Sequence, residues 1–169
     1  GQNRLHYSNV SINAVDDVTI KSTEYGEGYA LTNNGGNINI VAGNNVELVS
    51  YDRPAVRADY GITDSNINVT GKNITVAGKA REHEDSEFKP SVIYAQGIGV
   101  LNFSANDNIN ISDTAKIGGN AVGAYDGGVV NIKNATDVVL DGKVYANGED
   151  AVVNFDNVEN ITITSRVAE

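Results

Sequence analysis

The stretch that decides the fold is Asn37-Ile38-Asn39-Ile40-Val41-Ala42-Gly43-Asn44-Asn45-Val46-Glu47-Leu48. Ile38 and Ile40 flank one polar residue, and Val46 and Leu48 repeat this alternation eight residues later. Apolar residues that alternate with polar ones are typical of a half-buried β-strand. Gly43 and the two asparagines after it tolerate positive φ, so we expect a sharp turn between two short strands.

The same pattern occurs six times along the chain, which indicates a repeat structure. In each copy the second apolar pair follows the first by eight residues, or by seven in the third copy. The copies begin 28, 29, 34, 29 and 23 residues apart, at Val10, Ile38, Ile67, Leu101, Val130 and Val153. A weaker third pair closes each of the first five copies, at Ala30/Thr32, Val56/Ala58, Ile93/Ala95, Val122/Ala124 and Val144/Ala146. Short strands repeated at this interval predict a solenoid.

We therefore predict an all-β fold: a parallel β-helix, or β-solenoid, of about six coils with three short strands per coil. Equivalent apolar residues should stack in rows inside it, and the 23 Asn residues can form side-chain hydrogen-bond ladders between coils. The expected organisation is one solenoid domain over residues 1–169. The absence of methionine, even at position 1, suggests a fragment of a longer chain.

Composition excludes several classes of function. The net charge of −10 argues against nucleic acid or an anionic membrane surface as a partner, because both require a basic surface. The lack of cysteine excludes disulfides and cysteine-ligated metals. No apolar run reaches transmembrane length, so we expect no membrane insertion by this segment. We expect no cofactor.

Repeated segments such as Ser65-Asn66-Ile67-Asn68-Val69-Thr70-Gly71-Lys72-Asn73-Ile74-Thr75-Val76 resemble the passenger domains of bacterial autotransporter adhesins, which use the type V secretion route. The resemblance covers residues 7–165 and rests on repeat style, Asn and Gly richness and the lack of cysteine. It implies a right-handed parallel β-helix, outer-membrane export and cell-surface display in the parent protein. It also implies adhesion to a host surface or matrix protein or glycan, self-association, biofilm formation and a role in virulence.

The largest break in the repeat is an insertion at residues 79–90, within the 34-residue spacing. It is densely charged, and we expect it to project from the rod. As a contact loop it would offer the candidate binding residues Arg81, Glu82, His83, Glu84, Asp85, Glu87 and Phe88. The alternative is a tolerated, solvated insertion. We expect no metal site there, because neighbouring side chains point in different directions.

A second candidate patch lies in the connector at residues 51–60. Tyr51, Arg53, Arg57 and Tyr60 are residue types favoured at contacts. Alternatively, the arginines form intramolecular pairs, Arg53 with Asp52 and Arg57 with Asp59.

Other tyrosines also fall in third-strand or connector regions, where they could stack on sugar rings if several share one face. These are Tyr25, Tyr29, Tyr94, Tyr125 and Tyr145. They could equally be ordinary residues of coil corners.

Three functional hypotheses remain: an adhesive module, a structural stalk that displays a distal binding tip, and a polysaccharide lyase or hydrolase. We expect no enzyme, because no carboxylate pair or Gly-x-Ser-x-Gly motif is marked and only two histidines are present. Self-association would use the outward asparagine ridge Asn39, Asn68, Asn102, Asn131 and Asn154.

Overall fold

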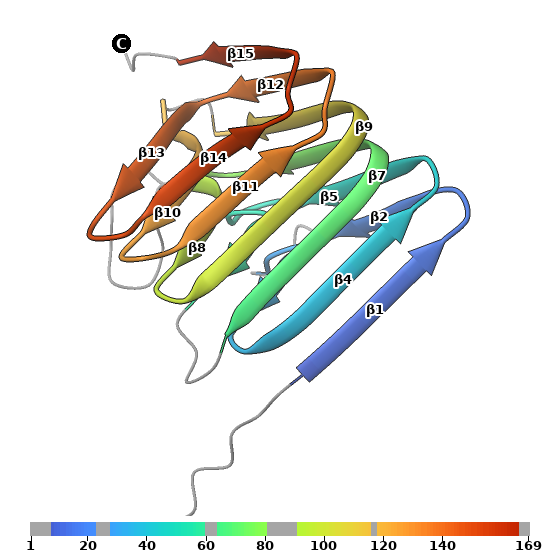
Figure 1. The fold of residues 1–169 in the computed structure, drawn as a ribbon, viewed down its shortest axis with the longest axis horizontal. Helices are drawn as coiled ribbons and strands as arrows, with labels where there is room; N and C mark the ends of the chain where they lie inside the picture. Colours follow the sequence, from blue (N-terminus) through green and yellow to red (C-terminus); the bar gives the residue numbers. More distant parts are fainter. Residues whose placement is uncertain (1–7, 23–27, 60–63, 81–90, 116–117, 166–169) are drawn as a thin grey trace, which may run out of the picture.

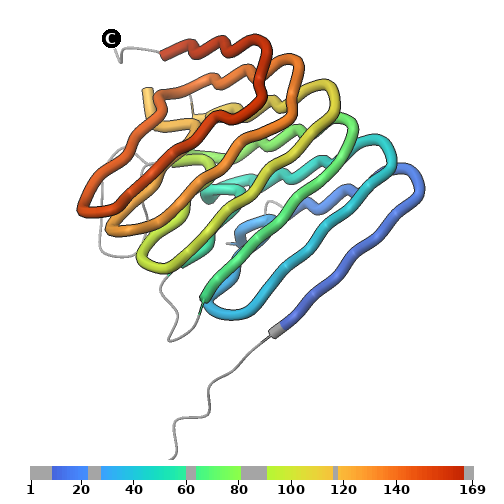
Figure 2. Tube along the Cα trace, in the orientation of Figure 1, coloured from blue at the N-terminus to red at the C-terminus, as the bar shows by residue number. Residues whose placement is uncertain are grey.

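Three stacks of parallel strands form the molecule in the computed structural model, which describes residues 8–22, 28–59, 64–80, 91–115 and 118–165 (Figure 1). Each of the first five passes of the chain contributes one segment to each stack in turn, and the sixth contributes described strands to the first two stacks. Successive coils therefore lie on top of one another (Figure 2). This confirms the predicted all-β parallel solenoid.

The first-strand stack contains β1 (Ser8–Ala14), β4 (Gly36–Ala42), the first half of β7 (Ser65–Gly78), the first half of β9 (Gly99–Asp113), β11 (Val129–Lys133) and β14 (Val152–Asp156). The second-strand stack contains β2 (Val18–Lys21), β5 (Asn45–Val49), the second halves of β7 and β9, β12 (Asp137–Asp141) and β15 (Asn160–Thr164). Because β7 and β9 run through the corner unbroken, these stacks form one bent ten-stranded sheet within the described part of the chain.

The third-strand stack is a separate five-stranded sheet in the described residues. It contains β3 (Leu31–Asn33), β6 (Val56–Ala58), β8 (Ser91–Gln96), β10 (Asn120–Tyr125) and β13 (Lys143–Asn147).

The inner rows follow the predicted register. Ile38 pairs with Ile67, which pairs with Leu101, and the same row continues through Val130 to Val153. Ile67 and Leu101 are fully buried. Burial of each such side chain stabilises the fold by about 1.5–3 kcal/mol, so the stacked rows supply its main hydrophobic core.

One third-strand prediction was wrong by a single residue. In β3 the inward residues are Leu31 and Asn33, which align with Val56 and Ala58, whereas Thr32 points outward and is exposed. Asn33 is tolerated inside because its Nδ2 donates to the carbonyls of Gly36 (2.8 Å) and Asn66 (3.0 Å). A polar residue with complete hydrogen bonding can thus occupy a core row.

Gly43 sits at the predicted corner, but not for the predicted reason. Neither Gly43 nor the two asparagines after it is among the described residues with positive φ. A Cβ at position 43 would instead lie 1.8 Å from the carbonyl oxygen of Val15 in the preceding coil. Glycine is required there by the close approach of stacked corners.

Candidate functional site

The two segments predicted to carry binding residues meet at one corner of the solenoid. The connector after β5 lies against the residues that follow β7: the backbone N–H of Lys79 donates to the carbonyl of Arg53 (2.9 Å). The side chains of Lys79 and Asp52 form a salt bridge of 2.8 Å, with about half of each side chain exposed. Tyr51 is 54% exposed beside them. The connector and the base of the insertion therefore form a continuous surface.

The remaining residues predicted for this corner lie outside the described residues. They are Arg81, Glu82, His83, Glu84, Asp85, Glu87, Phe88 and Tyr60. Their role as contact residues stays a prediction.

A residue that the sequence reasoning missed, Asp113, anchors Ala80, the last described residue at the start of the insertion. Its Oδ1 accepts hydrogen bonds from the backbone N–H groups of Ala80 and Ala115, both at 3.0 Å. Asp113 is only 4% exposed. The bond to Ala115, two residues ahead, is that of an Asx-turn, and an aspartate two residues after the second apolar pair was the available signal for it.

Arg57 is engaged within the chain, as the intramolecular alternative predicted. Its guanidinium forms an ion pair with the buried carboxylate of Asp59 and donates to the hydroxyl of Tyr29 (3.1 Å). It also lies over the rings of Tyr29 and Tyr94, 5.5 and 5.9 Å from their centroids. The Arg57 charge is thus paired with one carboxylate and lies over two aromatic rings, and these contacts stabilise the outer side of the third-strand sheet.

Tyrosines do gather on that outer side, but mostly as packed residues. The rings of Tyr94 and Tyr125 meet edge to face at 6.1 Å, and Tyr145 packs on Tyr125 at 5.7 Å. Tyr94 and Tyr125 are buried, so of these three tyrosines a sugar ring could reach only Tyr145, which is 39% exposed. Tyr25 lies outside the described residues.

These tyrosines have the environment of buried side chains. The Tyr125 hydroxyl lies 2.8 Å from Ser91 Oγ and accepts from Asn120 Nδ2 at 3.2 Å. Burial raises the pKa of the Tyr94 phenol well above its usual range, and the neighbouring Tyr29 raises it further. The proton of Tyr94 is therefore held in the folded chain.

The outer side of the first-strand stack carries the predicted asparagine ladder. From Asn68 onward, each amide donates to the Oδ1 of its neighbour in the preceding coil, at 2.8–2.9 Å, along the row Asn39, Asn68, Asn102, Asn131 and Asn154. A shorter ladder runs beside it along Asn9, Asn37 and Asn66. Such side-chain ladders add hydrogen bonds to the backbone pairing of the coils.

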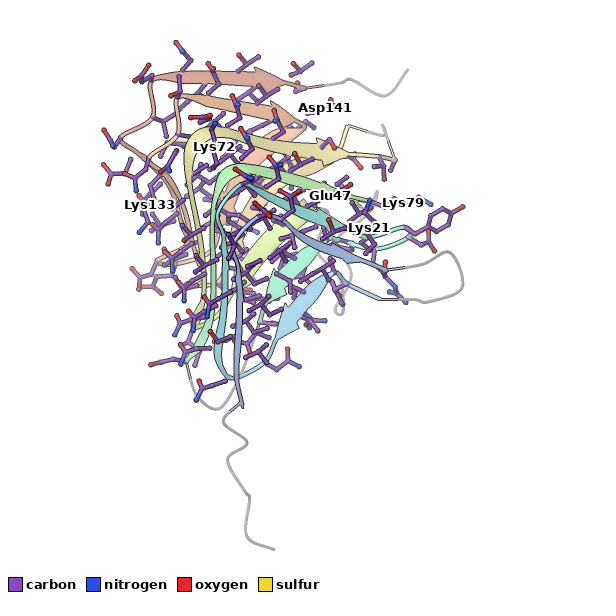
Figure 3. The ribbon with its side chains drawn as sticks, turned by 90° about the vertical axis from the view of Figure 1, so that its right-hand side faces the viewer. Lys21, Glu47, Lys72, Lys79, Lys133 and Asp141 are labelled. Carbon is purple, nitrogen blue, oxygen red and sulfur yellow. The ribbon has the colours of Figure 1, made fainter. Side chains whose placement is uncertain are left out.

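We call this outer surface the amide face. It consists of three aligned rows: Asn9, Asn37, Asn66, Val100, Val129 and Val152; Ser11, Asn39, Asn68, Asn102, Asn131 and Asn154; Asn13, Val41, Thr70, Ser104, Lys133 and Asp156. Of these eighteen described positions only Lys133 and Asp156 carry a charge. In Figure 3, Lys133 lies on the side of the ribbon opposite Lys21, Glu47 and Lys79.

Within the described residues no group of three or more His, Cys, Asp or Glu side chains could hold a metal ion. No helix in the described part of the chain is long and apolar enough to cross a membrane. Comparisons with protein-family models, curated proteins and solved structures give no match to this chain.

Proposed function

We propose that the chain is an adhesive module of a bacterial cell-surface protein of the autotransporter type, and that it associates with further copies of itself through the amide face. The observation that carries this proposal is the near absence of charge on that face in a molecule with a net charge of −10. Like charges oppose the approach of two copies, and the opposition is smallest where their charges are fewest.

The chemistry of the face supports weak, repeated contacts. Each internal amide of the ladder already uses one N–H and one carbonyl lone pair to bond its neighbours, so only its remaining donor and acceptor can reach a partner. Val41 (43% exposed) and Val152 (38%) add some apolar area.

The size of the amide face also supports weak contacts. Six strands spaced about 4.8 Å apart and five residues of about 3.3 Å each make a face of roughly 400–500 Å². A typical stable interface buries about 800 Å² per partner. We therefore expect weak pairwise association that becomes strong when many copies are displayed together.

Sedimentation of the whole chain over a range of concentrations tests this proposal. Two outward substitutions, Val41→Glu and Thr70→Glu, place carboxylates on the amide face and should abolish association. The matched control is Thr75→Glu with Val139→Glu, two exposed positions on the outer side of the second-strand stack. This control replaces the same two residue types, Val and Thr, and changes the net charge by the same amount. It should leave association intact. Equal loss in both variants, with both folded by circular dichroism, would contradict the role of the amide face.

A stalk that displays a distal tip is the second candidate, and the internal pairing of charged groups favours it. Arg57 is held by Asp59, and the Lys79 ammonium by Asp52, which leaves fewer charged groups for an outside partner. Binding of host-matrix proteins and glycans, compared with Tyr51→Ala at the exposed corner, separates the two. A monomeric chain that binds none of these partners would support the stalk and overturn the adhesive proposal.

A further inference from the structure

The sequence contains two Asn-Gly pairs, Asn34-Gly35 and Asn147-Gly148, and the structure places them in different environments. Asn-Gly is the dipeptide in which an asparagine side chain is most easily attacked by the next backbone nitrogen, because glycine has no Cβ to obstruct the approach. Both asparagines are exposed, so the difference between the two pairs lies in the glycines.

The backbone nitrogen of Gly148 is free to attack the Asn147 side chain. It begins the exposed turn between β13 and β14, where Gly148 has φ +94° and Asp150 has φ +59°. The carbonyl of Asn147 accepts a hydrogen bond from the N–H of Asp126 (2.9 Å). The N–H of Gly148 has no hydrogen-bond partner among the described residues.

Gly35 is held. It is buried, and its N–H donates to Oδ1 of Asn33 at 3.2 Å. Asn33 is itself fixed in the core by the two hydrogen bonds from its Nδ2. Attack by the Gly35 nitrogen would require this buried arrangement to open first.

We infer that Asn147 is a site of spontaneous deamidation, a modification that uses only water. The Gly148 nitrogen loses its proton and bonds to Cγ of Asn147, and the side-chain nitrogen leaves as ammonia. The product is a five-membered succinimide. Water then opens either of the two ring C–N bonds, which gives aspartate or β-linked isoaspartate at position 147.

The reaction would change the charge of one corner. Position 147 lies beside Asp126 and is followed by Glu149 and Asp150, all three exposed. A new carboxylate there raises the local repulsion, and the isoaspartate form also adds a backbone carbon at the end of β13. This inference does not depend on the proposed adhesive function.

The test is incubation of the whole folded chain in mildly alkaline buffer, followed by peptide mass mapping and an enzymatic isoaspartate assay. Asn34 serves as the internal control. In the folded chain we expect conversion at Asn147 to be faster than at Asn34 by about tenfold or more, equivalent to about 1.4 kcal/mol in the barrier. In denaturant the two rates should converge. Asn147→Gln, whose longer side chain would require a six-membered ring, should remove the acidic product.

Equal rates at both sites in the folded chain, or earlier conversion of Asn34, would overturn the inference. So would an unreacted Asn147 in the folded chain under conditions in which the denatured chain converts.

Discussion

The amide face and the outer side of the third-strand sheet arise from the same alternation of side chains, yet they differ in burial and chemistry. The asparagines Asn39, Asn68, Asn102 and Asn131 are half-buried by one another and open to one side. In the third-strand sheet, outward Tyr94 and Tyr125 are as buried as the core. Alternation therefore sets the direction of a side chain, whereas its neighbours set its exposure.

Gly123 shows how the packed side is built. It occupies the outward position between Tyr94 and Tyr145 in the register, and a Cβ there would lie 2.3 Å from Ser91 Oγ and 2.6 Å from Tyr125 Cε2. The missing side chain leaves room for the Tyr125 ring to lie across the strand. One face is thus a surface of hydrogen-bonded amides, and the other is a second, smaller packed layer.

The largest effect on stability is expected in the inner rows, which serve as the reference for the two outer faces. Ile109→Asp would bury an unpaired charge in a fully buried position and should destabilise the fold by at least about 4–5 kcal/mol. Asn110→Asp, one residue away on the outside, is the control and should change stability little. Thermal melts followed by far-UV circular dichroism measure both. Similar melting temperatures for the two variants would refute the assignment of inside and outside.

The second prediction concerns the packed outer layer. Tyr125→Ala should cost about 3–5 kcal/mol, as expected for loss of a buried aromatic ring, and it leaves Ser91 and Asn120 without their shared partner. Tyr145→Ala, at a half-exposed ring, should cost clearly less. Chemical denaturation gives both values. If the two variants lose equal stability, the third-strand sheet has no buried outer layer.

The third prediction concerns the amide face. Asn102→Ala removes one hydrogen bond to Asn68 and one from Asn131, each worth about 0.5–1.5 kcal/mol, and should destabilise the chain by about 1–3 kcal/mol. The matched control is Asn110→Ala, an exposed outward asparagine of the same strand with no side-chain hydrogen bond among the described residues. Equal stability of the two variants would show that the ladder contributes nothing.

The smallest effect is one of pH. The folded chain holds the Tyr94 proton beyond the pH at which a free phenol ionises, about 10. The contribution of the protonated Tyr94 phenol to folding stability is therefore complete below about pH 10. It is lost as the pH rises further, because Tyr94 then releases its proton more readily in the unfolded chain than in the folded chain. Tyr94→Phe should flatten the decline in stability above about pH 10. Unchanged pH dependence in this variant would contradict a buried neutral phenol.

The register of the inner rows and the asparagine ladder could be predicted, because both depend on a repeat that is visible in the sequence. The shift from Thr32 to Asn33 in β3 could not be predicted, since the carbonyls that accept the Asn33 hydrogen bonds belong to residues 36 and 66. The pairing of Arg57 with Asp59 was one of two open alternatives. The buried layer around Tyr125 was missed because it depends on the absence of a side chain at Gly123 in a different row.

The ladders also have a direction. In each one the amide nitrogen points to the preceding coil, as in the row from Asn160 to Asp137 and the row from Asn108 through Asn73 and Asn45 to Asp17. A carboxylate has no proton to pass on, so aspartate can begin such a chain but cannot continue it. Aspartate stands at the start of both rows. The solenoid thus has a chemical polarity along its axis, and a coil grafted onto it would have to present acceptors toward one end and donors toward the other.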